Sequence, residues 1–280
     1  MNSVALRARV DIDTSAMASI AGEGVLLAGG MRAILLQVAH PAAGRGVAEH
    51  SNFTYRAMDR LRATMTYVYC MIFGSSWEKR AIRDQVNAVH RDINGPGYNA
   101  FDPELQLWVA ATLYETAFGL YERWVGGVED DLAEVIYRQY RVLGAALQMR
   151  EEQWPADRAA FRAYWNDMLQ RLTVTDDARA VCQDLFHPQR IPLLVRAIMP
   201  LNRLVTAALL PEPIRDGYNI EWNARRQRRF DRFSRTVSLV YPHLPAPVRQ
   251  FPRIWYMRDM RRRLARGSTH CSGARVNESD

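Results

Sequence analysis

The chain has 280 residues, 48% of them hydrophobic and 24% charged, and a formal net charge of +7. This composition is typical of a globular protein, and the length allows one large or two small cores. Three widely spaced cysteines, Cys70, Cys182 and Cys271, argue against a disulfide framework.

The two most apolar stretches, residues 25–40 and 193–210, are not expected to span a bilayer. Arg32 interrupts the first, and the second contains Arg196, Pro200, Asn202 and Arg203. The first 15 residues contain no long apolar run of the kind found in secretory signals. We therefore expect a cytoplasmic protein that can contact a membrane only peripherally.

Apolar residues recur at helical spacing almost throughout, and Val, Ile and Thr do not gather into alternating runs. We predict ten helices, over residues 24–39, 55–73, 75–95, 103–125, 130–149, 155–172, 176–185, 191–210, 221–241 and 245–265. Pro41 is expected to end the first helix, and Asp102 and Pro103 form a cap and first turn for the fourth. The predicted fold is an all-α, single-domain helical bundle without a sheet of consequence.

No linker, internal repeat or low-complexity tract divides the periodic segments. We expect one domain over residues 15–266, with flexible termini at residues 1–14 and 267–280.

The positive charge is concentrated in a C-terminal segment. Residues 224–266 contain 13 arginines and two acidic residues, a net charge of +11, so the rest of the chain carries −4. Arginine binds phosphates and carboxylates bidentately, which fits nucleic acid, an anionic membrane surface or the anionic groups of a cofactor. A solvated helix face is the simplest explanation. We expect no nucleic-acid partner, and a peripheral anionic membrane contact through residues 225–266 remains an alternative.

Several common catalytic motifs are missing from the chain. There is no third glycine after GEG at residues 22–24, no GxxxxGK[ST] loop, no GxSxG elbow and no HExxH helix. No histidine has a glutamate three residues before it, which removes the main ligand source of a ferritin-like di-iron bundle. Because CxxCH is also missing, any haem would have to bind non-covalently.

His90 is the most informative single residue of the sequence. At helical spacing Ile82, Val86, Val89 and Ile93 surround it, so its imidazole is expected to point toward the core. A buried imidazole needs a partner, which can be a carbonyl or hydroxyl group or a metal such as haem iron. Spacing alone leaves both alternatives open.

Other polar residues interrupt apolar segments nearby. Gln37 and His40 end an apolar helix, and Glu49 follows in VAEHSNF. Arg60 and Thr64 are four residues apart and therefore lie on one helix face. Each of these residues also has a purely structural explanation. His40 can cap a helix end, Glu49 can be a charge at a helix end, and Arg60 with Thr64 can form a solvated stripe.

Taken in order, these segments resemble a known family. The succession LLQVAHPAAGRGVAEHSNF, RLRATMTYVYCMIFG and VNAVHRDINGPGYNAFDPELQLWVAATLYE, followed by WPADRAAFRAYWNDML and LLPEPIRDGYNIEWNARRQRRF, is similar to the oxygenase family that includes bacterial latex clearing proteins and the fungal oxygenase of the mycophenolic acid pathway. The resemblance covers residues 24–264. It implies an all-α fold enclosing a non-covalent haem b, with O2 as co-substrate.

The resemblance also implies roles for individual residues. His90, in AVHRDING, takes the position of the proximal metal ligand; Arg60 and Thr64 take the positions of a catalytic pair beside the haem; and Glu49 takes that of the proposed base. The chain departs from the family at Ala63, where rubber-cleaving members have a lysine that can occupy the sixth iron position. It departs again at Ala110, where many relatives have the histidine of WVHAT.

The functional hypothesis is a haem b-dependent oxygenase that uses O2 on a small, apolar, unsaturated substrate such as an isoprenoid or lipid, with oxidative C=C cleavage as the reaction the resemblance implies. Two alternatives stay open. The first is a haem-binding or sensing protein of the same fold without turnover, and the second is a non-enzymatic helical protein at a membrane surface.

Overall fold

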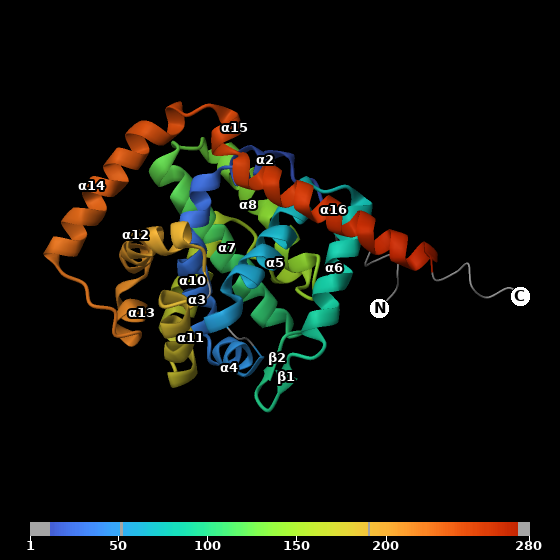
Figure 1. Ribbon diagram of the computed structural model, residues 1–280. Coiled ribbons are helices and arrows are strands. Elements are labelled where there is room, and N and C mark those ends of the chain that lie inside the picture. The colour runs from blue at the N-terminus through green and yellow to red at the C-terminus, as the bar shows by residue number, and fades with distance from the viewer. Residues whose placement is uncertain (1–11, 51–52, 190, 274–280) are drawn as a thin grey trace, which may run out of the picture.

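The computed structural model describes residues 12–50, 53–189 and 191–273. These residues form a bundle in which α3, α5 and α7 occupy the centre and the other helices surround them (Figure 1). The helices are, in chain order, α2 (Ser15–Ala21), the 3-10 helix η1 (Gly24–Gly29), α3 (Gly30–Val38), α4 (Pro41–His50), α5 (Phe53–Phe73), α6 (Ser76–His90), α7 (Pro103–Trp124), α8 (Asp130–Tyr140), α9 (Val142–Ala145), η2 (Glu151–Gln153), α10 (Arg158–Arg171), α11 (Asp176–Phe186), α12 (Leu193–Leu209), α13 (Glu212–Gly217), α14 (Ala224–Val240), η3 (Tyr241–His243), α15 (Ala246–Arg249) and α16 (Phe251–Gly273). The predicted all-α fold is confirmed.

The central helix α7 begins where the sequence predicts. The Asp102 carboxylate accepts a hydrogen bond from the Glu104 amide at 2.8 Å, and Pro103 occupies the first turn. Its buried face carries Trp108 and Tyr114 into an aromatic cluster, where Tyr114 meets the ring of Phe161 edge-on at 4.9 Å. Aromatic pairs of this geometry stabilise a core beyond their buried area, so α7 is fixed on several sides.

Arg32 lies inside the core, although it interrupts an apolar segment. Its Nε donates to the Leu209 carbonyl at 2.8 Å, its Nη1 donates to Thr116 Oγ1 at 2.5 Å, and it forms an ion pair with Glu115. The guanidinium therefore joins α3 to α7 and to the end of α12, and its charge is compensated inside the bundle.

The helix boundaries differ from the predicted ones in several places. Pro41 ends one helix but also begins α4, because Pro is well suited to a first helical turn. The short helix α2 precedes the first predicted helix. At the other end α16 continues to Gly273, past the expected end at residue 265.

The predicted helix over residues 75–95 ends early, at His90. A two-stranded hairpin follows, in which β1 (Asn94–Gly95) pairs with β2 (Tyr98–Asn99). Gly97, at φ +84°, supplies the left-handed turn residue after Pro96 that a helix cannot contain. This turn chemistry overrides the helical periodicity that continues to Ile93.

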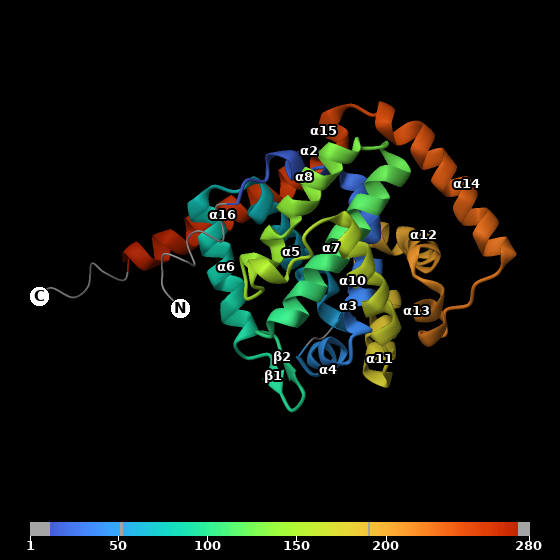
Figure 2. The same ribbon diagram turned by 180° about the vertical axis from the view of Figure 1, so that it is seen from behind.

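The last helices form a separate feature at the edge of the bundle. Figure 1 shows α15 at the top, with α14 and α16 descending from it on opposite sides, and the reverse view in Figure 2 shows the same arrangement. Of the described residues of α14, Phe230 alone is buried, so this helix lies mostly on the surface.

Within the described residues, no individual helix has both the length and the apolar character needed to cross a membrane. One pair of segments, Ser15–Ala21 with Gly24–Val38, meets that test by length and composition when taken together, but it is bent by 77°.

Candidate functional site

The α5–α6 pair positions the residues that the sequence singles out. A capping box at Ser75 begins α6: the Ser75 amide donates to the Glu78 carboxylate at 2.8 Å, and the Glu78 amide donates back to the Ser75 hydroxyl at 3.3 Å. Because α6 follows α5 after a tight turn, the two helices run antiparallel and pack together. The end of α6, with His90, therefore lies beside the first half of α5, which carries Arg60.

His90 is half-buried, and its ring nitrogen Nδ1 is buried without a hydrogen-bond partner among the described residues. Burial, and to a lesser extent the positive charge of Arg60, lowers the pKa of His90 below its ordinary value. The imidazole is therefore neutral at pH 7, which is the form that binds a metal.

The surroundings of His90 differ from the prediction at one position. Ile82 is buried and Val86 packs against the core, as expected, but Val89 is 62% exposed. Because the helix ends at His90, Ile93 leaves the helical register and approaches Gly46 of α4 instead, where an added Cβ would lie 3.6 Å from the Ile93 side chain. His90 thus sits at the border of the core, between buried and exposed positions.

Arg60 and Thr64 lie one helical turn apart on α5, as the spacing predicts, but their environments differ. Arg60 is half-buried and acts electrostatically on His90, whereas Thr64 and the neighbouring Ala63 are exposed. The charge of Arg60 therefore acts on His90, whereas Thr64 lies on the solvent side of α5.

Glu49 belongs to a hydrogen-bonded group that joins the end of α4 to the hairpin. Its carboxylate accepts from Tyr98 Oη at 2.5 Å and from Arg45 Nε at 2.8 Å. The hydrogen bond from Tyr98, followed by the one from Arg45, lowers the pKa of Glu49. His50 Nε2 lies 2.9 Å from the same Tyr98 oxygen. Glu49 is therefore held as an exposed carboxylate, and its lowered pKa makes it a weaker base than a free glutamate.

Tyr98 is a site residue that the sequence reasoning missed. Its ring is buried although its hydroxyl reaches Glu49, and an added Cβ at Gly95 would approach the ring to within 2.7 Å. The turn residues of NGPGYN could have predicted this position, because a Pro-Gly turn reverses the chain direction and brings the following tyrosine next to the residues before the turn.

His40 is a second half-buried imidazole with an unpartnered Nδ1 among the described residues. Burial lowers its pKa, while the charges of Asp102 and Glu104 act in the opposite direction. Just before it, Gln37 Nε2 donates to Thr112 Oγ1 of α7 at 2.9 Å. His40 is therefore the best matched control for His90 in a mutagenesis experiment.

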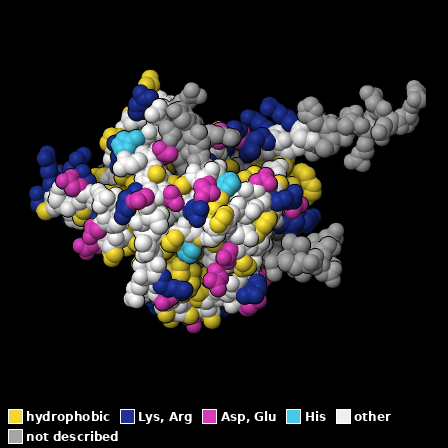
Figure 3. Space-filling view, turned by 90° about the horizontal axis from the view of Figure 1, so that it is seen from below, with side chains coloured by type: hydrophobic (Ala, Val, Ile, Leu, Met, Phe, Trp, Pro, Cys, Tyr) yellow, Lys and Arg dark blue, Asp and Glu magenta, His cyan; other side chains and the backbone are white. Residues whose placement is uncertain are grey.

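Figure 3 views the molecule from below, toward the end where α4 and the hairpin lie. Histidine side chains reach the surface there, among acidic, basic and apolar side chains in a mixed distribution. This end differs in charge from the arginine-rich α14 and α16.

The site residues fit one axial ligand for a haem. A neutral imidazole with an unpartnered, buried nitrogen supplies that ligand, and an adjacent arginine can pair with a propionate. Among the described residues no group of three or more His, Cys, Asp or Glu side chains is arranged to hold a metal ion. Cavities of about 300 and 270 Å³ lie beside α16 and α14, and neither is lined by His90, Arg60 or Thr64. The enclosed haem pocket remains a prediction.

The described residues form an all-α bundle, with His90 half-buried and its Nδ1 unpartnered at the end of α6. The family model described as the ER-bound oxygenase mpaB/B'/rubber oxygenase catalytic domain matches residues 18–239, and the chain belongs to this family. The predicted resemblance is thereby confirmed, as is the general assignment to an oxygenase-type oxidoreductase.

Two curated relatives align over most of the chain. They are the uncharacterized protein Mb2261 of Mycobacterium bovis and the uncharacterized protein Rv2237 of Mycobacterium tuberculosis. Each is 32% identical over 244 residues, which cover 84% of this chain and 96% of the relative. No solved structure matches the chain.

Proposed function

We propose that the protein is a haem b-dependent oxygenase that uses O2 to cleave a carbon–carbon double bond in a small apolar substrate of the isoprenoid or lipid class. The observation that carries the proposal is His90 in a chain of an oxygenase family: a neutral imidazole, unpartnered at a buried nitrogen and beside a cation. A core histidine with a purely structural role is normally hydrogen-bonded.

The roles of the residues follow from their positions. His90 would hold the iron through its neutral ring, and Arg60 would pair with a haem propionate and so fix the orientation of the group. Thr64 would offer a hydroxyl to an oxygen ligand or substrate from the exposed side of α5. The haem, when bound, would supply the iron that binds and activates O2.

Glu49 would act as a proton acceptor only when its hydrogen bonds are rearranged. In the structure its two oxygens are occupied by Tyr98 and Arg45, and both interactions favour the carboxylate over the acid. A base of this kind accepts protons weakly until one of these donors moves away.

A cytoplasmic location is part of the proposal. Cys70 and Cys182 are both buried free thiols, which is the usual state of cysteine in a reducing compartment. We propose no nucleic-acid partner.

An absorption spectrum combined with oxygen uptake tests the function. Protein purified after expression with a haem precursor should show a Soret band, and O2 consumption should rise with an unsaturated isoprenoid but not with its saturated analogue. A Soret band without substrate-dependent uptake would favour a haem-binding or sensing protein. The lack of any Soret band, even after addition of haemin, would contradict the proposal.

A further inference from the structure

The corner formed by the end of α14, α15 and the start of α16 exposes an unusual amount of apolar surface. Five large apolar side chains of this corner are between 45% and 65% exposed: Leu239, Val240, Val248, Phe251 and Trp255. Figure 1 shows that the corner is the uppermost point of the molecule, away from the α4 and hairpin end. Clustered exposed apolar side chains of this kind mark a surface that meets a partner.

The two helices that leave the corner carry the same pattern. On α14 the exposed residues Arg228, Arg232, Arg235 and Leu239 follow each other at spacings of four, three and four. On α16 the exposed residues Phe251, Trp255, Arg258 and Arg262 follow each other at the same spacings of four, three and four, with the apolar residues first. Such spacing places each set on one face of its helix. An apolar tip therefore lies between two rows of arginines.

These arginines are available to an external anion. No acidic side chain of the described residues forms an ion pair with Arg228, Arg232, Arg235, Arg258 or Arg262. By contrast, Arg261 pairs with Glu78 and Arg263 with Asp259, so the acids near α16 are already used.

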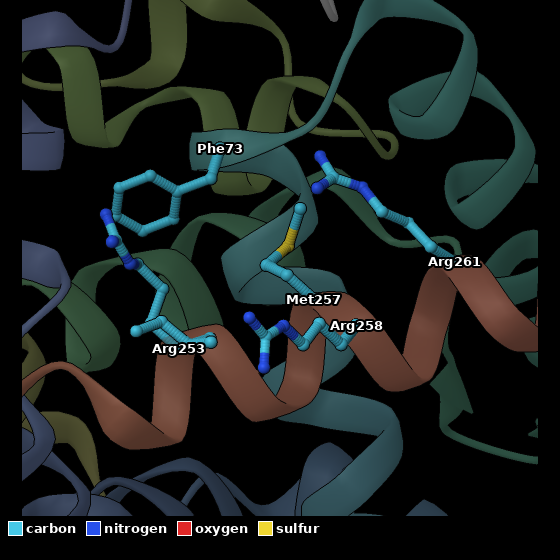
Figure 4. Close-up of a pocket in the computed structure, with 6 residues that line it drawn as sticks. Phe73, Arg253, Met257, Arg258 and Arg261 are labelled. Atoms are coloured by element: carbon cyan, nitrogen blue, oxygen red, sulfur yellow. The ribbon is translucent and has the colours of Figure 1, made fainter. Parts of the chain in front are cut away.

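A surface cavity of about 300 Å³ adjoins the row on α16. Figure 4 shows the guanidinium groups of Arg253, Arg258 and Arg261 around the apolar side chains of Phe73 and Met257. Arg253 is stacked on the Phe73 ring, 4.9 Å from its centroid. Arg261 is paired with Glu78, which leaves Arg253 and Arg258 beside apolar atoms, an arrangement that suits a phosphate attached to an acyl chain.

We infer that this corner docks on the surface of an anionic phospholipid bilayer. Phe251, Trp255 and Leu239 enter the interfacial region, and the arginine rows on both sides bind lipid phosphates. A second copy of this chain is a poor occupant, because two segments of net charge +11 would repel each other. Nucleic acid is a poorer occupant, because bases could stack on Phe251 and Trp255 but would leave the exposed aliphatic side chains of Leu239, Val240 and Val248 in water.

Only the purpose of docking, which is access to an apolar substrate dissolved in the bilayer, depends on the proposed function. Docking itself requires neither haem nor turnover. Vesicle binding and the Soret band can therefore fail independently of each other.

Co-sedimentation with vesicles tests the inference, using phosphatidylcholine alone and phosphatidylcholine with about 30% phosphatidylserine. The full chain should bind the anionic vesicles at low salt and lose about tenfold or more in partition coefficient at physiological salt. Arg258→Gln with Arg262→Gln should reduce low-salt binding roughly 10- to 30-fold. The control Arg138→Gln with Arg162→Gln removes the same charge from α8 and α10 and should change binding less than about threefold.

The apolar tip is tested separately. Phe251→Ser with Trp255→Ser should lower the partition coefficient about tenfold or more, whereas the control Leu132→Ser with Val135→Ser, a similarly exposed pair on α8, should leave it unchanged. Brominated lipids should quench the fluorescence of the wild-type chain, and Trp255→Phe should remove that quenching.

Three results would overturn the inference: equal binding by the tip variant and its control, no binding to anionic vesicles at low salt, or a dimer in solution that the tip variant dissociates. The last result would assign the corner to a second copy of this chain.

Discussion

Replacing Arg32 by methionine tests how the bundle tolerates a charge in its centre. The methionine keeps much of the volume but removes the donors to Leu209 and Thr116 and the ion-pair partner of Glu115. The ion pair with Arg32 is made to Glu115 Oε2, and this buried oxygen has no hydrogen-bond partner among the described residues, so the variant leaves it without compensation. We expect substantial destabilisation for this reason.

The magnitude follows from the exposure of the two partners. Removing one member of a buried ion pair costs about 3–5 kcal/mol, and because the Glu115 side chain is 31% exposed we expect the lower end, about 3 kcal/mol. For a chain of this size the melting temperature should fall by roughly 6–12 °C. The matched control Arg162→Met replaces an exposed arginine and should change stability by less than about 0.5 kcal/mol.

A double-mutant cycle with Glu115→Gln identifies the cause. Because the second change removes the uncompensated charge, the double variant should be more stable than the sum of the two single effects by about 1–2 kcal/mol. Thermal and urea unfolding, followed by circular dichroism, measure all four proteins. Additive effects, or a melting temperature of Arg32→Met within about 2 °C of the wild type, would refute the reasoning.

Three further predictions concern the site. Thr64→Val should fold normally, because the side chain is exposed, yet alter the spectrum of the reduced, O2-bound protein; an unchanged spectrum and autoxidation rate would place Thr64 away from the haem. Tyr98→Phe removes the strongest hydrogen bond to Glu49 and should raise the pKa of Glu49, measured by carboxyl-carbon NMR titration; a constant pKa would show that Tyr98 does not hold the carboxylate. His40 and His90 have lowered pKa values in the folded chain, so the unfolded chain binds more protons below pH 6.5; the free energy of unfolding should be greatest above that pH and decrease as the pH falls toward 5, and replacing both histidines by asparagine should flatten that slope between pH 5 and 7.

Local signals in the sequence predicted the fold well. The Asp102 cap with Pro103 and the helical periodicity each depend on residues within one or two turns of each other. The spacing of Arg60 and Thr64 predicts that they lie one turn apart on α5, but it does not predict that Thr64 is exposed while Arg60 is half-buried.

Contacts between distant segments could not be read from the sequence. Glu49 and Tyr98 are 49 positions apart, and nothing in either local pattern indicates that a hairpin brings them together. Val89 continues an apolar helical pattern, yet its side chain is exposed in the folded chain. Arg32 interrupts an apolar segment in the sequence, and its three partners on α7 and at the end of α12 are seen only in the packed structure.

The most direct test of the central claim compares haem binding by His90→Ala, His40→Ala and the wild-type chain. Both variants remove a half-buried imidazole with an unpartnered Nδ1, so the general cost of losing such a side chain is matched. Circular dichroism establishes that each variant remains helical, and titration with haemin gives the stoichiometry from the Soret band. We predict one haem per chain for the wild type and for His40→Ala, no stoichiometric haem for His90→Ala, and partial recovery of that variant's spectrum with added imidazole. A folded His90→Ala protein with full haem and an unaltered ferric spectrum would contradict the assignment.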